Sequence, residues 1–320
     1  MSDANTSFDQ IASTTLKNYR KTLEDNIFKK LPLFYKLYDN NRKKLDGGEK
    51  IVIPLLYGEN STAGSYDGYD VLDTTPQTGI SAAEYSWRQY AVTITISGKE
   101  ERQNSGKEKM INLLEAKTMQ AEKSLKKVMD VAAFGSAGDS GSDDINGLQQ
   151  IVDVAPTTDT FGGINRATST NAFWRNNATT GIGSFAANGL DEMRSMFNTC
   201  SDEGTDTPDI LITTQAVFEY YEKLLQVQER FTDSKTADAG FQNLKFKNET
   251  LMWDSNCTAG YMYFLNSDYL NLSVHSGCDF ILEPFIKPVD QDAKSAKYLW
   301  MGNLVSSNCA RMGVLSGITA

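Results

Sequence analysis

Two strand-like segments separated by a long polar insertion form the clearest pattern along the chain. The first covers residues 49–57 and the second residues 85–97. Apolar residues occupy every second position from Tyr90 to Ile96, and this period of two predicts a strand with one buried face. The insertion, residues 58–84, is rich in Gly, Asp, Ser, Thr and Tyr and is longer than an ordinary connection inside a compact domain. We therefore predict an extended loop with a strand at each end, placed on another subunit.

A long amphipathic helix is predicted after the second strand, over residues 105–134. Ser105 and Glu108 have the spacing of a capping box, which marks a helix start. Apolar residues, Val128 among them, recur at helical spacing and predict one buried face, whereas the opposite face is polar and includes Asp130. At about 1.5 Å per residue, the helix is roughly 40 Å long.

The remaining segments predict a mixture of helices and strands. In residues 1–45, apolar positions alternate irregularly with polar ones, and Pro32 limits helix formation to short pieces near 15–30 and 33–40. Beyond residue 160, further helices are expected at 184–199 and 216–226. Strands are expected at 209–213, 244–246, 250–253, 262–265, 270–273, 280–286, 298–305 and 310–317.

Composition excludes several classes of protein. The 320-residue chain has a net charge of −10, which argues against a surface that binds nucleic acid. No apolar run reaches the roughly 18 residues that a membrane span needs. The four cysteines are far apart and His275 is the only histidine, so no zinc site is expected. Residues 139–150 lack the ligand pattern of a calcium loop. We expect no cofactor and no catalytic residue.

The order of the segments resembles that of a known family. The residues that carry the resemblance are 22–28 before the insertion, 47–55 and 87–97 on either side of it, and 244–254, 260–266 and 270–272 later in the chain. In this pattern the chain resembles the major capsid proteins of tailed bacteriophages, which have the HK97-like fold.

The resemblance implies an α+β fold with four parts. These are an N-terminal arm (1–45), an extended two-stranded E-loop (46–104), a peripheral domain with a long spine helix at 105–134 (105–159 and 284–320), and an axial domain (160–283).

The resemblance also implies a function. The chain is expected to be a non-enzymatic coat protein that forms hexamers and pentamers. These would build the icosahedral head of a virion, assembled in the cytoplasm of a bacterial host, around double-stranded DNA that is bound without sequence specificity. A separate scaffolding protein, a portal and decoration proteins are the implied partners, and no membrane is involved. Some family members cross-link an E-loop lysine to an asparagine. Here no lysine lies between Lys50 and Lys99, so we expect no covalent bond.

Charge suggests how subunits make contact. Residues 58–84 carry five carboxylates and no Lys or Arg, a charge of −5, whereas residues 107–134 have six Lys and four acidic residues, a charge of +2. We expect the loop of one subunit to lie on the spine helix of its neighbour. The expected contacts are Glu59, Tyr66, Asp67, Tyr69, Asp70, Val71, Leu72 and Asp73 in the loop, Lys117, Lys123, Lys126 and Lys127 in the helix, and Ile27, Phe28, Leu33 and Phe34 in the arm.

Two alternative functions are compatible with the sequence. A cellular nanocompartment shell of the encapsulin type has the same fold and would enclose cargo enzymes instead of DNA. A soluble hydrolase with an acidic cleft is the alternative from another class, because 41 acidic residues can form carboxylate pairs in many ways.

Overall fold

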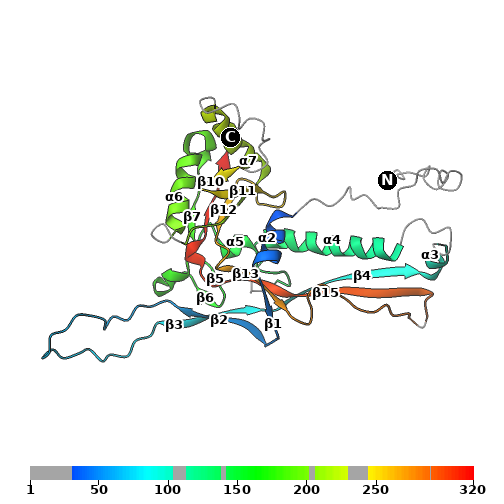
Figure 1. Ribbon diagram of the computed structural model, residues 1–320, viewed down its shortest axis with the longest axis horizontal. Coiled ribbons are helices and arrows are strands. Elements are labelled where there is room, and N and C mark those ends of the chain that lie inside the picture. The colour runs from blue at the N-terminus through cyan, green and yellow to red at the C-terminus, as the bar shows by residue number, and fades with distance from the viewer. Residues whose placement is uncertain (1–30, 104–112, 138–141, 202–205, 230–243, 289) are drawn as a thin grey trace. The chain divides into compact units, whose positions relative to one another are not determined.

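The computed structural model describes residues 31–103, 113–137, 142–201, 206–229, 244–288 and 290–320. The chain divides into two compact units. Of the described residues, the larger unit comprises 31–90, 126–137, 142–201, 206–229, 244–281 and 299–320, and the smaller comprises 91–103, 113–125, 282–288 and 290–298. Figure 1 labels many of the elements of both.

One sheet of the larger unit is built on two completely buried strands. All four residues of β9 (Ile210–Thr213) and all four of β12 (Met262–Leu265) are buried, and the two strands pair antiparallel. The remaining described strands of this sheet are β7 (Asn177–Thr179), β10 (Lys245–Phe246), β11 (Glu249–Trp253) and β16 (Gly313–Leu315), in the order β10-β11-β9-β12-β16-β7.

Two helices supply the apolar side chains that cover this sheet. They are α6 (Leu190–Cys200) and α7 (Gln215–Glu229), close to the helices expected at 184–199 and 216–226. Met196 and Phe197 of α6 and Tyr221 of α7 join one buried cluster with residues of β9, β11 and β12. Apolar burial of this kind is the main driving force for forming such a layer.

A second sheet has the described order β1-β13-β15-β14, with β4 paired to β15. β13 and β15 pair antiparallel, and β1 joins β13 in parallel. β13 comes before residue 284 and pairs with a strand after it, while β16 comes after 284 and pairs with β12. These pairings join segments on both sides of residue 284, where the sequence placed a boundary between two parts. The four-part division itself stays a prediction. The bounds are β1 (Arg42–Leu45), β4 (Arg88–Ser97), β13 (Leu270–His275), β14 (Ile281–Leu282) and β15 (Ala293–Ser306).

The expected extended loop has a regular antiparallel base. β2 (Lys50–Leu56) pairs with β3 (Ile80–Ser86) over seven residue pairs, which leaves residues 57–79 as the loop. The return strand predicted at 85–97 is in fact two strands, β3 and β4, separated at Trp87. The indole of Trp87 donates a hydrogen bond to the carbonyl oxygen of Gly48 at 2.8 Å.

The long helix is described as α4 (Leu113–Ala133), and the start expected at residue 105 lies outside the described residues. Its buried positions, four residues apart, are Ala121, Leu125, Met129 and Ala133. The expected assignment of two positions to its faces was wrong. Val128 lies about 100° round the helix from this stripe and is 53% exposed, and Asp130, expected on the polar face, is completely buried.

Shorter elements complete the described chain. The helix expected at 33–40 is confirmed as α2 (Pro32–Asn40), and the one expected at 15–30 lies outside the described residues. None of the described helices is long and apolar enough to cross a membrane. The others are α3 (Gly98–Gln103), α5 (Leu148–Ile151), β5 (Thr160–Phe161), β6 (Ile164–Asn165), η2 (Ser169–Trp174), β8 (Gly183–Ser184), η3 (Phe185–Gly189), η4 (Cys309–Arg311) and β17 (Ile318–Thr319).

The base of the hairpin is fixed to the core of the larger unit through Tyr85. This side chain is completely buried, and its hydroxyl donates to the carbonyl oxygen of Ser306 at 2.7 Å. Its ring lies 5.3 Å from that of Phe161, which in turn stacks on Trp174. Gly162 approaches so closely that a Cβ there would lie 3.0 Å from the Tyr85 hydroxyl. The hairpin therefore starts from a rigid point.

Replacing Tyr85 with Phe tests this anchor. The change leaves the carbonyl of Ser306 without this donor, so we expect the free energy of unfolding to fall by about 1–2 kcal/mol in a denaturant titration. Tyr66→Phe, on the exposed loop, is the matched control and should change stability by less than about 0.5 kcal/mol. Equal effects of the two substitutions would contradict the anchor.

Candidate functional site

The neck of the loop is closed by a stacked aromatic pair and two glycines. The ring of Tyr57 lies 4.5 Å from that of Phe173, and the two ring planes meet at 14°. The backbone N–H of Tyr57 donates to the carbonyl oxygen of Gly79 at 2.9 Å. A Cβ on Gly79 would lie 2.8 Å from the carbonyl oxygen of Gly58. The two segments of the loop can approach this closely because both residues are glycine. The loop therefore leaves the hairpin as a defined structure.

Some carboxylates of the loop stabilise its own turns. The Asp70 carboxylate accepts from the N–H of Asp67 at 2.8 Å. Asp73 accepts from both the hydroxyl and the N–H of Thr75, and these hydrogen bonds lower the pKa of Asp73. Short polar side chains that bond to backbone two or three residues away are typical of turns. These carboxylates therefore have a local structural role whether or not they also contact a neighbour.

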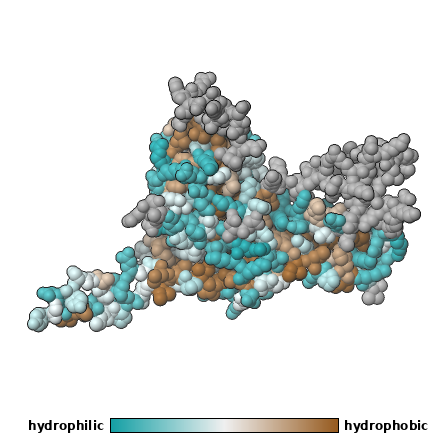
Figure 2. Space-filling view, in the orientation of Figure 1, coloured by the Kyte–Doolittle hydropathy of each residue, from teal (hydrophilic) through white to brown (hydrophobic). Residues whose placement is uncertain are grey.

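The apolar loop side chains that were predicted for contact are exposed to solvent. Tyr69 and Val71 are fully exposed, and Tyr66 and Leu72 are 68% and 59% exposed. In the space-filling view the loop shows isolated hydrophobic patches among hydrophilic and neutral ones (Figure 2). The loop therefore exposes the four apolar side chains that were predicted for contact, and their contact with a neighbour stays a prediction.

The outer face of the hairpin extends this apolar surface, and sequence reasoning missed it. Val52, Leu56 and Ile80 are all more than half exposed, and Leu56 lies directly opposite Ile80 in the strand pair. The opposite face carries buried Ile51 and Leu55. The signal was present in the sequence, because β2 is apolar at both odd and even positions, whereas a strand with one solvated face alternates.

The four lysines predicted on the spine helix differ in how far they are available for contact with a neighbouring subunit. Lys117 forms an ion pair with Glu100 at 3.1 Å and donates to the carbonyl oxygen of Thr95. Lys123 is half-buried, and the Lys126 ammonium lies 5.5 Å from the centre of the Phe280 ring. Lys127 is exposed.

Lys127 lies in a surface that mixes charge with apolar side chains. Val128 and Val131 are each at least half exposed, and positions 127 and 131 share one face of α4. We call Lys127, Val128 and Val131 the α4 patch. Its composition suits a partner that presents both carboxylates and apolar side chains.

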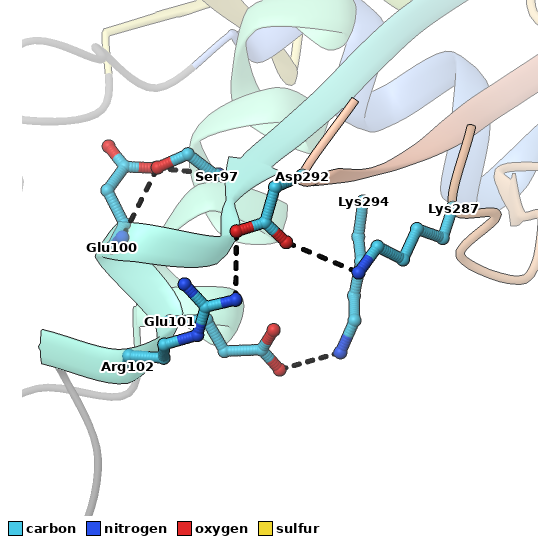
Figure 3. A network of polar contacts seen from close by, with 7 residues as sticks. All are labelled: Ser97, Glu100, Glu101, Arg102, Lys287, Asp292 and Lys294. Atoms are coloured by element: carbon cyan, nitrogen blue, oxygen red, sulfur yellow. Dashed lines mark hydrogen bonds and ion pairs between the residues drawn. The ribbon is translucent and has the colours of Figure 1, made fainter. Parts of the chain in front are cut away.

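A polar network in the smaller unit holds α3 and thereby Glu100 (Figure 3). The Ser97 hydroxyl accepts from the N–H of Glu100 and the Glu100 carboxylate accepts from the N–H of Ser97, a reciprocal cap at the start of α3. Because the Ser97 N–H and Lys117 both bond to Glu100, its pKa is lowered. The ion pairs of the network are Arg102–Asp292 at 2.9 Å, Lys287–Asp292 at 3.2 Å and Lys294–Glu101 at 2.7 Å.

Only two of the four residues predicted for contact in the N-terminal arm lie in the described part of the chain. Ile27 and Phe28 lie outside the described residues. Leu33 and Phe34 are buried within the chain itself, and the ring of Phe34 lies 6.4 Å from that of Phe280. The same subunit therefore supplies the surface that these two residues need, and their contact with a neighbour stays a prediction.

One pocket of the larger unit is lined in part by two acidic residues. Asp153 and Asp159 line it together with Gln149, Gln150 and Tyr261. Each carboxylate accepts a backbone N–H of its own turn, from Ala155 at 3.0 Å and from Thr160 at 2.7 Å. Within the described ranges, no group of three or more His, Cys, Asp and Glu could hold a metal ion.

Comparison with known proteins gives matches only at the level of structure. No family model matches the sequence, and no curated protein matches it. The structure is similar to the capsid protein of cyanophage A-1(L), with a TM-score of 0.69 and 17% identity over 95% of this chain and 98% of that one. It is similar to the capsid protein of a native GTA particle, with a TM-score of 0.63 and 11% identity over 96% of both chains. It is also similar to the SrpI encapsulin of Synechococcus elongatus, with a TM-score of 0.59 and 10% identity over 96% of this chain and 95% of that one. The chain therefore has the mixed α and β HK97-like fold that these capsid and compartment shells share.

Proposed function

We propose that this chain is a major capsid protein that self-assembles into an icosahedral head around double-stranded DNA. The observation that carries the proposal is the extended loop, which is anchored at Tyr85 and yet exposes Tyr69 and Val71 completely. A folded chain gains nothing by holding apolar side chains in water on a rigid arm, but an assembly gains by burying them. The same fold forms closed shells in the similar structures named above.

The proposed contact places the loop of one subunit on the α4 patch of its neighbour. Each exposed ion pair contributes only about 0–1 kcal/mol, so Glu59 and Asp67 would mainly set register and specificity. Burial of Tyr69, Val71 and the outer hairpin face would contribute more, at roughly 25 cal/mol for each Å² of apolar surface. The contact would be non-covalent, because no lysine lies between Lys50 and Lys99.

The assembly would consist of hexamers and pentamers and would be part of a virion formed in the bacterial cytoplasm. A separate scaffolding protein, a portal and decoration proteins would be its partners. It would have no catalytic activity and no cofactor. A net charge of −10 suits a container, since an acidic wall does not hold DNA tightly.

A cellular compartment shell is the second candidate, and the similarity to an encapsulin over 96% of this chain favours it. The two candidates differ in what the shell encloses, which is DNA in a capsid and a protein cargo in a compartment. Nuclease-resistant DNA in particles purified from the native source would support the capsid.

Electron microscopy of the purified full chain tests the assembly itself. We expect closed shells, tubes or free hexamers, because the exposed apolar surface of the loop favours association. A monomer that stays monomeric on concentration and turns over a substrate would overturn the proposal.

Charge changes in the loop test the electrostatic part of the contact. The triple variant Glu59→Lys, Asp67→Asn and Asp70→Asn changes the charge by +4 and keeps acceptors for the turn around Asp67. We expect fewer assembled particles in about 0.1 M salt, and a weaker salt dependence of assembly than in the unaltered chain. Light scattering over a range of ionic strength is the measurement.

A matched control carries the same +4 change elsewhere, as Glu219→Lys, Asp143→Asn and Asp191→Asn, all at exposed positions. The control should assemble like the unaltered chain. Assembly of the loop variant that is normal at every ionic strength would refute the electrostatic contribution.

Polar substitutions of apolar loop residues test the hydrophobic part of the contact. Val71→Ser together with Leu72→Ser should impair assembly more than the charge variant, and high salt should not restore it, because hydrophobic association is not screened. The unfolding midpoint should stay unchanged, since both side chains are exposed. A loss of stability equal to the loss of assembly would point to misfolding of the loop instead of a lost contact.

A further inference from the structure

The β2–β3 hairpin contacts the rest of the larger unit near both of its ends, and both contacts come from one short segment. We call this segment, residues 160–175, the platform. Near the base of the hairpin, the ring of Tyr85 lies 5.3 Å from that of Phe161. Where the hairpin opens into the loop, the ring of Tyr57 stacks on that of Phe173 at 4.5 Å. The platform therefore supports both ends of the hairpin.

Beyond this stack, the loop bonds only to itself. Within the described residues, every hydrogen bond of residues 59–78 joins two residues of the loop. One of them, from the Ser61 hydroxyl to the side-chain oxygen of Gln77 at 3.0 Å, links the outgoing and the returning sides. No ion pair or ring contact joins residues 59–78 to the rest of the described chain. The stack of Tyr57 on Phe173 is therefore the last such contact between the loop and the platform.

The platform is held in the larger unit by the guanidinium group of Arg166, which is completely buried. It donates to the carbonyl oxygens of Gln150 at 2.9 Å and Ile151 at 2.8 Å. It also lies 5.1 Å from the centre of the Phe161 ring. A buried charge is costly unless it is hydrogen-bonded, so this group favours one position of the platform, in which these carbonyl groups meet it.

Two further side chains fix η2, the part of the platform that carries Phe173. Arg175, directly after η2, donates from its Nε to the carbonyl oxygen of Arg166 at 2.7 Å. Trp174 is 1% exposed, and its indole donates to the carbonyl oxygen of Phe161 at 2.8 Å. Phe173 itself is only half-buried, so a fixed backbone presents its ring to the hairpin.

We propose that Phe173 is a positioning residue, which fixes the direction in which the loop leaves the hairpin. A second step rests on the proposed function. In the assembly, the direction of the loop sets the angle between neighbouring subunits, and a repeated contact closes into a shell only for particular angles. Phe173 would thus keep the shells uniform without touching the neighbour that the loop contacts.

Hydrogen exchange with mass spectrometry tests the positioning contact in the full chain, at concentrations where light scattering shows no assembly. Phe173→Leu keeps an apolar side chain and removes the ring stack. The loss of such a stack corresponds to roughly a two- to tenfold shift in an opening equilibrium. We expect this rise at the amides of Tyr57 and Gly58, which share the carbonyl oxygen of Gly79 as acceptor. The amides of β12, buried in the first sheet, serve as the internal reference.

Two controls separate positioning from a general loss of stability. Phe173→Tyr keeps the stack and should exchange like the unaltered chain. Phe246→Leu removes another half-buried ring, which packs on Phe197 and Tyr221, and should leave the neck of the loop unchanged. Unchanged exchange in Phe173→Leu, or an equal rise in Phe246→Leu, would overturn the proposal. If Phe173→Leu does not fold, Tyr57→Leu removes the same stack from the side of the hairpin and must give the same rise.

Electron microscopy of assembled particles tests the consequence for the shell. Phe173→Leu should give a broader range of diameters and more open shells than the unaltered chain, whereas Phe173→Tyr should not. An equally narrow range in Phe173→Leu, together with raised exchange at Tyr57, would overturn the effect on the angle between subunits. If the unaltered chain forms no particles, the proposed function fails, and the exchange result alone decides whether Phe173 positions the loop.

Discussion

The burial of only one face of the β2–β3 hairpin is the constraint on which the other features depend. A two-stranded ribbon is barely stable alone in water and needs a surface on which to pack. Here Ile51, Leu55 and Tyr85 supply that packing, and the hydroxyl of Tyr85 fixes the position through Ser306. The opposite face, with Val52, Leu56 and Ile80, stays more than half exposed in the described chain. Because the base is rigid, the loop can present its apolar side chains without collapsing onto the core.

In the proposed assembly, the anchored base of the hairpin and the exposed loop together favour self-association. A solvent-exposed loop with Tyr69 and Val71 fully exposed would make a monomer prone to aggregation. Acidic side chains at the turns of the loop limit that risk, because they repel a second copy of the same loop while remaining attractive to a basic surface. Asp70 and Asp73 make local hydrogen bonds in the loop, and in the proposed assembly the same residues would contribute to specificity.

Much of the fold could be predicted from local patterns. The alternation from Tyr90 to Ile96, the largely apolar runs of β9 and β12, and the helices α6 and α7 each follow from sequence pattern within a few residues. Periodicity could not place Val128 and Asp130. The buried stripe of α4 is set by what packs beside it, and the buried carboxyl group of Asp130 accepts a hydrogen bond from Asn256, which is far away in the sequence. The split of the return strand at Trp87 is likewise not visible in the alternation of apolar residues, and neither is the hydrogen bond of its indole to Gly48.

The candidate contact surface could likewise be predicted from the sequence only in part. Exposure of Tyr66, Tyr69, Val71 and Leu72 agrees with what the polar composition of the loop predicts, but the availability of the lysines depends on tertiary partners. Lys117 is engaged because the reciprocal cap at Ser97 orients Glu100 toward it, whereas Lys127 is exposed. A charge count over α4 therefore overstates the basic surface offered to a neighbour. The exposed valines beside Lys127 shift the balance toward apolar contact, because burial of apolar area stabilises an interface more than exposed ion pairs do.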